Sequence, residues 1–241
     1  VERRVEDTSG VEVFVRNFAK TYYSWSNNKD SVAQRTDALT GYLTEDLQRL
    51  TADTVKSDVA VSSSVQDVQI WSVAQRGEND FAVVFTVAQT ISDGKKKDTV
   101  FSVYKTMVHK DDNGDMVITQ APTITGKPAK SAYTPKAAEP DGTVSAAESE
   151  DITDFLITFF TLYPTATEKE LSYYVSGDSM PPVKCADYAF NQLKSTVLNK
   201  DGDTVTATVA VEYLDSVTQM TQISQFELAL KRVDENWKIV G

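Results

Sequence analysis

VEVFVRNFAKTY, residues 11–22, and ITDFLITFFTLY, residues 152–163, carry apolar side chains at the same six positions, 141 residues apart. The shared positions are Val11, Phe14, Val15, Phe18, Ala19 and Tyr22 in the first stretch and Ile152, Phe155, Leu156, Phe159, Phe160 and Tyr163 in the second. A stripe with this spacing forms one face of an amphipathic helix. Each stripe is followed by a short helical stretch, a run of alternating strands and an acidic turn before the last strand. We therefore predict two copies of one α+β module.

The first module is predicted to begin with a helix over residues 10–25, which Ser9 and Glu12 would open as a capping box. A shorter helix is expected over residues 38–50, with Leu39, Tyr42, Leu43, Leu47 and Leu50 along one side. The apolar period then changes to two, which predicts strands at Val59 and Val61 and at residues 65–73, 81–91, 100–108 and 116–121. The turns between them are short, and short connections require antiparallel neighbours.

The second module repeats this order in fewer residues. Its helix is predicted to start at the capping box formed by Ser145 and Glu148 and to stop near Leu162, because Pro164 cannot continue it. A short helix over residues 167–175 and strands over residues 188–198, 205–211, 223–230 and 237–240 follow. Between the modules, residues 126–148 are rich in Pro, Gly and Ala and read as a solvated linker. The expected domains are residues 1–125 and 149–241.

Charge and composition narrow the classes of function. The chain has 241 residues, 41% of them hydrophobic, and a formal charge of −11, which indicates a folded protein that does not bind nucleic acid directly. The basic run Lys95–Lys97 directly follows Asp93-Gly94 and is expected to be a solvated hairpin turn. One cysteine, Cys185, rules out an internal disulfide. The sequence contains no stretch of about 18–20 apolar residues.

A resemblance to a known family sharpens this interpretation. Two α+β modules with a long helix, a short helix and a curved antiparallel sheet look like tandem NTF2-like domains. FVRNFAKTYYSW at residues 14–25, together with ALTGYL at residues 38–43, resembles the TcpC family of conjugative-element transfer proteins from Gram-positive bacteria. The resemblance covers essentially the whole chain.

The resemblance implies a non-enzymatic, structural subunit of a type IV secretion-like DNA-transfer apparatus, similar to VirB-type inner-membrane scaffold subunits. Such a protein has a membrane anchor and a soluble part outside the membrane, oligomerises with itself and binds other conjugation proteins. The chain begins at Val1 without an initiator methionine, so we expect an N-terminal membrane helix to precede it. The family contributes no catalytic residue, and we expect no cofactor and no metal.

The residues themselves leave an alternative open: a small-molecule-binding or lyase- or isomerase-type NTF2-like protein that uses the cone-shaped interior as a pocket. Such an enzyme needs a buried carboxylate or histidine beside a tyrosine. The single histidine, His109, is expected at an exposed strand end, and Tyr22, Tyr23, Tyr104 and Tyr163 are expected in the core. Cys185 lacks a histidine partner. An extracellular module that binds cell-wall material is a third possibility.

Two acidic turns, residues 111–115 and 199–203, invite comparison with calcium-binding loops. Both lack the glycine at position 6 that an EF-hand loop requires, so we expect ordinary hairpin turns.

Partner binding is predicted on the second module. Its early loop gathers Tyr173, Tyr174, Met180, Pro182 and Tyr188, and aromatic residues with methionine are typical of interface cores. The competing interpretation is that these side chains close the wide end of the cone against their own domain.

Overall fold

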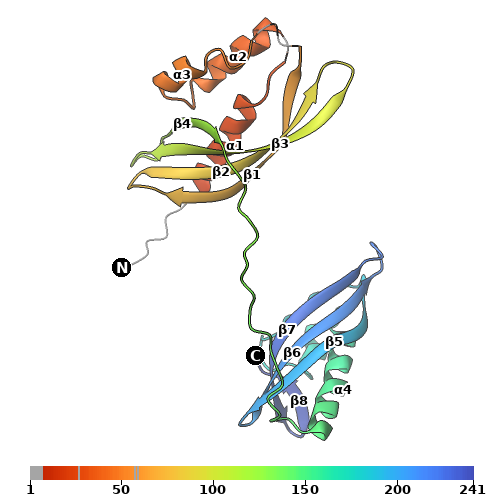
Figure 1. The fold of residues 1–241 in the computed structure, drawn as a ribbon. Coiled ribbons are helices and arrows are strands. Elements are labelled where there is room, and N and C mark those ends of the chain that lie inside the picture. Colours follow the sequence, from red (N-terminus) through yellow and green to blue (C-terminus); the bar gives the residue numbers. More distant parts are fainter. Residues whose placement is uncertain (1–7, 27, 57, 59) are drawn as a thin grey trace. The chain divides into compact units, whose positions relative to one another are not determined.

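The computed structural model describes residues 8–26, 28–56, 58 and 60–241. The chain divides into two units, residues 1–132 and 133–241 (Figure 1). Each unit contains a four-stranded antiparallel sheet and its own hydrophobic core, so the protein is of the α+β class.

Unit one consists of three helices followed by a meander. The helices are α1 (Ser9–Tyr22), α2 (Lys29–Leu39) and α3 (Glu45–Thr51), and the strands are β1 (Ser62–Gln75), β2 (Asp80–Ser92), β3 (Lys97–Lys110) and β4 (Met116–Ile124). The strands pair in chain order, β1-β2-β3-β4. Val11, Val15, Phe18 and Ala19 of the stripe are completely buried, and α1 packs with them against the sheet.

Unit two has the same order with fewer helical residues. It contains α4 (Ala146–Leu162), α5 (Glu168–Leu171), β5 (Tyr188–Asp201), β6 (Thr204–Asp215), β7 (Thr221–Val233) and β8 (Asn236–Ile239), with sheet order β5-β6-β7-β8. Ile152, Leu156, Phe159 and Phe160 of the second stripe are completely buried. The helix stops at Leu162, as Pro164 predicts.

The second helix of unit one differs from its prediction. Of the helix predicted over residues 38–50, the structure keeps only α3, on which Leu50 is 73% exposed. Helix α2 lies almost wholly before this range and was not predicted. Residues 42–44 leave the helical path because they bond to β4: the Ile118 amide donates to the Tyr42 carbonyl at 2.7 Å, and the Thr44 amide donates to the Ile118 carbonyl at 3.4 Å. The side chains of Asn28 and Thr44 then cap α2 and α3, respectively.

Unit two makes the same kind of bridge to its last strand. Val175 pairs in parallel with Ile239, as Leu43 pairs with Ile118 in unit one. The tyrosine before each bridge packs on the long helix of its unit: Tyr42 lies 5.4 Å from Phe14, and Tyr174 lies 6.1 Å from Phe155, between ring centroids. The internal repeat therefore extends beyond the helix stripe to these contacts.

Of the two predicted capping boxes, the one at Ser9 is wrong and the one at Ser145 is only half formed. Helix α1 already includes Ser9, and Thr8 at its N-cap makes no side-chain capping bond. Ser145 does cap α4, since its hydroxyl accepts from the Glu148 amide, but the Glu148 carboxylate binds Lys200 Nζ at 2.7 Å instead of returning to Ser145. A complete capping box occurs instead at α5, between Thr167 and Glu170.

The strands are longer at most ends than the apolar alternation predicted, and the first of them starts at Ser62, so the predicted residue Val61 lies just before it. Val59 lies outside the described residues. In the segment between the last strand of unit one and α4, residues 139–143 are bonded to the end of β5: Asn199 Nδ2 donates to the Glu139 carbonyl, and the Lys200 amide donates to the Thr143 hydroxyl. In the described part of the chain, no helix is long and apolar enough to cross a membrane.

Candidate functional site

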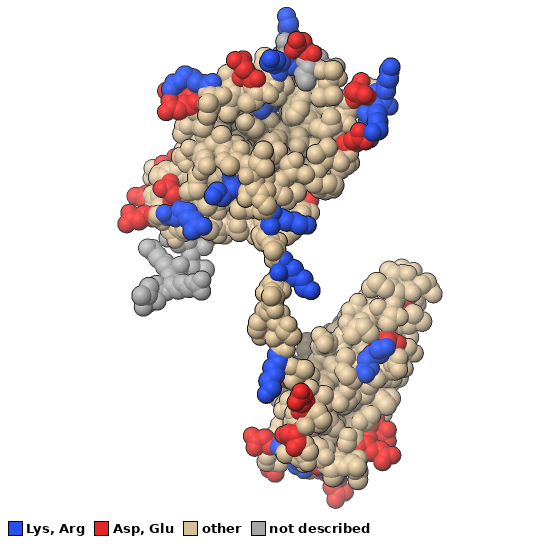
Figure 2. Space-filling view, in the orientation of Figure 1, with Lys and Arg blue, Asp and Glu red and all other residues tan. Residues whose placement is uncertain are grey.

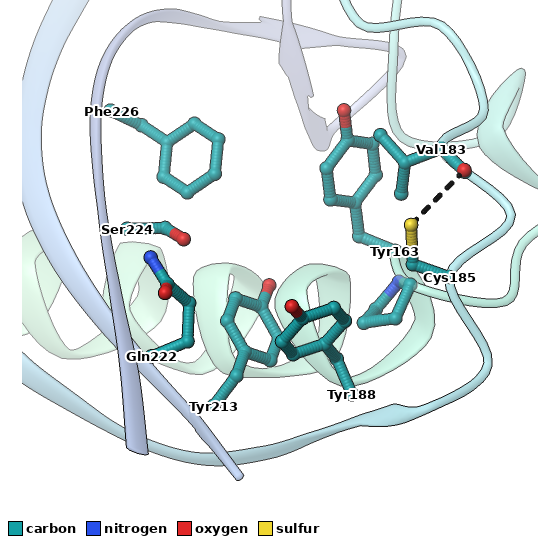
Figure 3. Close-up of a pocket in the computed structure, with 9 residues that line it drawn as sticks. Tyr163, Val183, Cys185, Tyr188, Tyr213, Gln222, Ser224 and Phe226 are labelled. Carbon is teal, nitrogen blue, oxygen red and sulfur yellow. Dashed lines mark hydrogen bonds between the residues drawn. The ribbon is translucent and has the colours of Figure 1, made fainter. Parts of the chain in front are cut away.

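One hollow of unit two is an aromatic pocket of about 480 Å³ (Figure 3). Nine residues line it: Tyr163, Pro164, Val183, Cys185, Tyr188, Tyr213, Gln222, Ser224 and Phe226. Tyr188 and Tyr213 form its floor, the side chains of β7 stand on one side, and Tyr163 stands on the other, with Val183 and Cys185 of the loop before β5. None of the lining side chains carries a full charge at neutral pH.

Hydrogen bonds fix two of the three tyrosines. The buried Tyr213 hydroxyl donates to the Phe160 carbonyl of α4 at 3.3 Å, and the Tyr163 hydroxyl donates to the Pro181 carbonyl at 3.3 Å. Tyr188 meets Tyr213 edge to face, with ring centroids 6.5 Å apart. These contacts hold the tyrosine rings in place. The other lining groups are apolar, with a few neutral polar ones, which is typical of a site that accepts an apolar group.

The ionisable groups of the pocket are poorly suited to proton transfer at neutral pH. Burial raises the pKa of Tyr213. It also raises the pKa of Tyr163, and the nearby Cys185 adds a smaller increase. A phenol with a raised pKa donates a hydrogen bond but gives up its proton reluctantly. Beside Tyr188, hydrogen bonds from Thr218, Val217 and Tyr188 hold the pKa of Asp215 below its usual range.

The two sheets have matching register, and a difference in what covers them explains why the pocket occurs in unit two. Phe85 pairs with Tyr104 in unit one, and Val209 pairs with Phe226 at the matching place in unit two. In unit one, Tyr23 stacks on Tyr104 at 4.7 Å and fills this place. Helix α2 also packs on α1 there, whereas no helix of comparable length follows α4 in the described chain. The same end of the interior is therefore filled in unit one and hollow in unit two.

A second hollow of unit two is acidic. It is lined by Asp151, Asp154, Phe155, Thr158, Tyr173, Tyr174, Val233, Asp234, Glu235, Asn236, Trp237 and Lys238. Asp151 is already engaged there, because its carboxylate accepts from Trp237 Nε1 at 2.9 Å and from Arg232. Figure 2 shows carboxylates gathered at the end of unit two where α4 begins, while the end formed by the β6–β7 hairpin carries almost no charge.

The five residues predicted to bind a partner do not form one patch. Tyr173 is 68% exposed and lines the acidic hollow with Tyr174, which packs partly on the core. Met180 is buried in the core, Pro182 is half-buried, and Tyr188 lines the aromatic pocket. The sequence analysis missed Tyr213 and Phe226 as pocket residues, because they continue the inward alternation of β6 and β7 and look like ordinary core positions.

The other candidate residues occupy structural positions. His109 lies at a strand end, 42% exposed, with Nδ1 2.9 Å from Asp80 Oδ1. Tyr22 and Tyr23 pack in or against the core of unit one, as does Tyr104. In the turn at residues 111–115, the Asp111 carboxylate accepts from the Asn113 and Asp115 amides, and Gly114 takes a φ of +90°, so the turn is a hairpin connection. In the described part of the chain, no cluster of acidic, histidine and cysteine side chains suits a metal ion.

Comparisons with known proteins agree with this architecture. A family model described as "Conjugative transposon protein TcpC" matches residues 14–240. A solved structure described as "Ntf2 like protein involved in plasmid conjugation" is similar over 94% of this chain and 92% of that chain, with a TM-score of 0.76 and 18% identity. No curated protein matches the chain.

Two shorter solved structures are similar to about half of the chain. One is described as "Ntf2-like, potential transfer protein TraM from Gram-positive conjugative plasmid pIP501", with 18% identity, coverage of 52% of this chain and 100% of that chain, and a TM-score of 0.37. The other is "Structure of a periplasmic fragment of TraM", with 10% identity, coverage of 48% and 96%, and a TM-score of 0.35.

The family match extends over nearly the whole chain, and the NTF2-like neighbour aligns with both units. The chain belongs to the TcpC family of conjugative transposon proteins.

Proposed function

We propose that this chain is a non-enzymatic structural subunit of a conjugative, type IV secretion-like DNA-transfer apparatus. It acts outside the membrane by oligomerising and by binding other transfer proteins. The observation that carries the proposal is the family match over residues 14–240. The similarity of fold to an NTF2-like conjugation protein, over 94% of the chain, supports the architecture that the proposal requires.

In this proposal the two units are tandem NTF2-like modules with curved sheets. The recurring contacts support this interpretation: Tyr42 on Phe14 and Tyr174 on Phe155 are matched pairs, and each unit has a parallel bridge to its last strand. In this proposal the protein is anchored in the membrane and lies in the envelope of a Gram-positive cell. Of the five residues predicted to bind a partner, we assign this role to Tyr173, Tyr174 and Tyr188, which line the two hollows of unit two, whereas Met180 is buried and Pro182 is half-buried.

The alternative is a small-molecule-binding or lyase-type protein that uses the aromatic pocket. The pocket has the size and apolar lining for a ligand, which is the observation in its favour. Catalysis would require a group that exchanges a proton near neutral pH, whereas burial raises the pKa values of Tyr163 and Tyr213. The lining therefore supports binding rather than proton transfer.

The test is conjugation from a donor whose copy of the gene is deleted. We expect transfer to fall to the background rate and to be restored by the wild-type gene and by Tyr213→Phe and Cys185→Ser variants, because both changes keep the shape of the pocket and remove only the phenol or thiol that could take part in chemistry. Loss of transfer with the Tyr213→Phe protein folded and present in the envelope at normal levels would favour chemistry at the pocket. Transfer unaffected by the deletion would refute the proposal.

A further inference from the structure

Half of strand β7 is an open sheet edge. Strand β7 pairs with β6 along its length, but the short β8 covers only Leu230 to Val233, and the chain end extends this cover to Ala229. The Ala229 amide and carbonyl both bond toward the β8 side. By the alternation of an antiparallel ladder, the backbone groups of Thr221, Ile223, Gln225 and Glu227 point the same way. Within the described chain, none of these four residues has a backbone partner on that side.

One of these outward backbone groups already has a side-chain partner from the same strand. The Ile223 carbonyl accepts from Nε2 of the neighbouring Gln222 at 2.9 Å. A side-chain amide that folds back onto its own strand is easily displaced by a backbone N–H of another strand, because the Gln222 amide can then bond to water instead.

The edge has few of the devices that usually prevent strands from joining, since Glu227 is the one charged residue among residues 221–228. Between Asp215 and Glu227 no residue is charged, and residues 221–228 contain neither Lys nor Pro. Natural edge strands are generally protected by such residues or by bulges, and the β6–β7 register is regular throughout. At the matching edge of unit one, by contrast, Lys97 and Asp98 begin β3, and Lys96 pairs with Asp98 at 3.0 Å.

The aromatic pocket lies directly beside this edge. Gln222, Ser224 and Phe226 of β7 form one of its walls, and Val183 and Cys185 of the opposing loop form another (Figure 3). A strand added to β7 would direct alternate side chains to the same face as Gln222, Ser224 and Phe226. Those side chains would enter the space above Tyr188 and Tyr213.

We propose that β7 and the aromatic pocket form a strand-addition site for an extended segment of a partner protein. The segment would bond to the edge through its backbone and insert an apolar or aromatic side chain into the pocket. This mode of recognition derives affinity from main-chain hydrogen bonds and specificity from the pocket that receives alternate side chains. The inference deepens the proposed function, since it names a surface by which a scaffold subunit holds another protein.

Net charge favours a partner protein over a second copy of this chain as the occupant of the site. Residues 149–241 carry 14 acidic and 7 basic side chains, so net charge disfavours a second copy of unit two at this edge, and oligomerisation would use another surface. The uncharged pocket and hairpin disfavour an acidic insert, because a carboxylate would lose its hydration without gaining a cation. The expected segment is therefore neutral or basic, with an apolar or aromatic anchor and β-branched neighbours.

The test uses a displayed library of random 12-residue peptides selected on the purified chain. We expect enriched peptides with alternating β-branched and aromatic residues and without acidic residues at the anchor. The selection is repeated on Gln225→Pro, which removes an outward N–H and blocks the edge with its ring while leaving the bonds to β6, and on Gln225→Thr as the matched control. An enriched peptide should bind Gln225→Pro at least about tenfold more weakly and Gln225→Thr normally.

Backbone methylation of the peptide makes the test independent of any variant's folding. Two forms of the best peptide are titrated on the wild-type chain. One form is N-methylated at the odd-numbered residues of the peptide and the other at the even-numbered residues. We expect one form to lose binding and the other to keep it, because only one register of amides faces β7 in a sheet.

Three results would overturn the proposal. Equal binding of both methylated forms would exclude strand addition, and the absence of any peptide specific for the open edge would exclude a peptide site. Self-association of the chain that Gln225→Pro abolishes, without peptide binding, would make the occupant a second copy. Each of these results leaves the deletion test of transfer unaffected, so the two proposals fail separately.

Discussion

Arg35 brings a positive charge into the interior of unit one. Only 6% of the residue is exposed; its Nε donates to the Tyr22 carbonyl at the end of α1 at 2.9 Å, and its guanidinium lies 4.9 Å from the Tyr22 ring centroid. Burial lowers its pKa, which shows that the site stabilises the charge only in part. The residue joins α2 to the end of α1 through a hydrogen bond, a ring contact and the packing of its stem.

Replacement of Arg35 by Ala should therefore destabilise unit one. We expect a loss of about 2–4 kcal/mol in the free energy of unfolding, because the Tyr22 carbonyl loses its donor and a buried stem leaves a void. Chemical denaturation followed by tryptophan fluorescence measures the change. Gln34→Ala, at the exposed neighbouring position of the same helix, is the control and should be within about 0.5 kcal/mol of wild type. Equal effects of the two changes would show that Arg35 contributes little.

Glu212 of β6 gives unit two a dependence on pH. Its carboxylate accepts from Gln192 Nε2 at 3.1 Å and from Asn191, and it pairs with Lys194 at 3.2 Å. Bonds from Gln192, Asn191 and Lys194, in that order, hold the pKa of Glu212 below its usual range. Because the folded pKa is the lower one, ionised Glu212 stabilises the fold above the ordinary carboxyl pKa, and this contribution is lost as pH falls through the lowered value.

A Glu212→Gln variant should thus be less stable than wild type near neutral pH and approach it in acid. The urea midpoints of the two proteins, compared at about pH 7 and at about pH 2, measure this convergence. Glu78→Gln, in the exposed β1–β2 turn, controls for the general loss of a negative charge. A gap between wild type and Glu212→Gln that stays constant with pH would contradict the assignment.

At the scale of elements, α5 is a four-residue helix held by its cap. The Thr167 hydroxyl accepts from the Glu170 amide at 3.3 Å, and the Glu170 carboxylate accepts from the Thr167 amide at 2.8 Å. The helix positions the buried residues Leu171 and Val175, and Val175 is the residue that bridges to β8. A helix this short has little stability of its own, so the cap decides whether it forms.

Removal of the cap by Thr167→Ala should cost about 1 kcal/mol of stability in unit two. It should also speed amide hydrogen exchange at residues 168–176, where the bridge to β8 depends on the position of α5. Thr165→Ala, an exposed threonine just before the helix, is the matched control. Normal protection of residues 168–176 in Thr167→Ala would show that tertiary packing alone holds the segment.

The elements also show which parts of the fold sequence can predict. The stripes of α1 and α4 were recognised because their periodicity is local and each side chain packs on one face. The break between α2 and α3 was missed because it depends on hydrogen bonds from residues 42–44 to Ile118, a partner far away in sequence. The aromatic pocket was missed for the same reason: Tyr213 and Phe226 alternate like core residues, and only the absence of a covering helix makes their place hollow.

At the scale of the molecule, each unit has a complete core, so we expect the two to unfold separately. Phe18 and Phe159 are completely buried at equivalent positions of α1 and α4. Truncation of either to Ala should cost its own unit about 3–5 kcal/mol, from lost burial and the cavity left behind. Hydrogen exchange read by mass spectrometry should show Phe18→Ala accelerating exchange only within residues 8–132 and Phe159→Ala only within residues 133–241. Acceleration in both units by either change would mean that they fold as one cooperative body, and unit two could then not be treated as an independent carrier of the β7 edge.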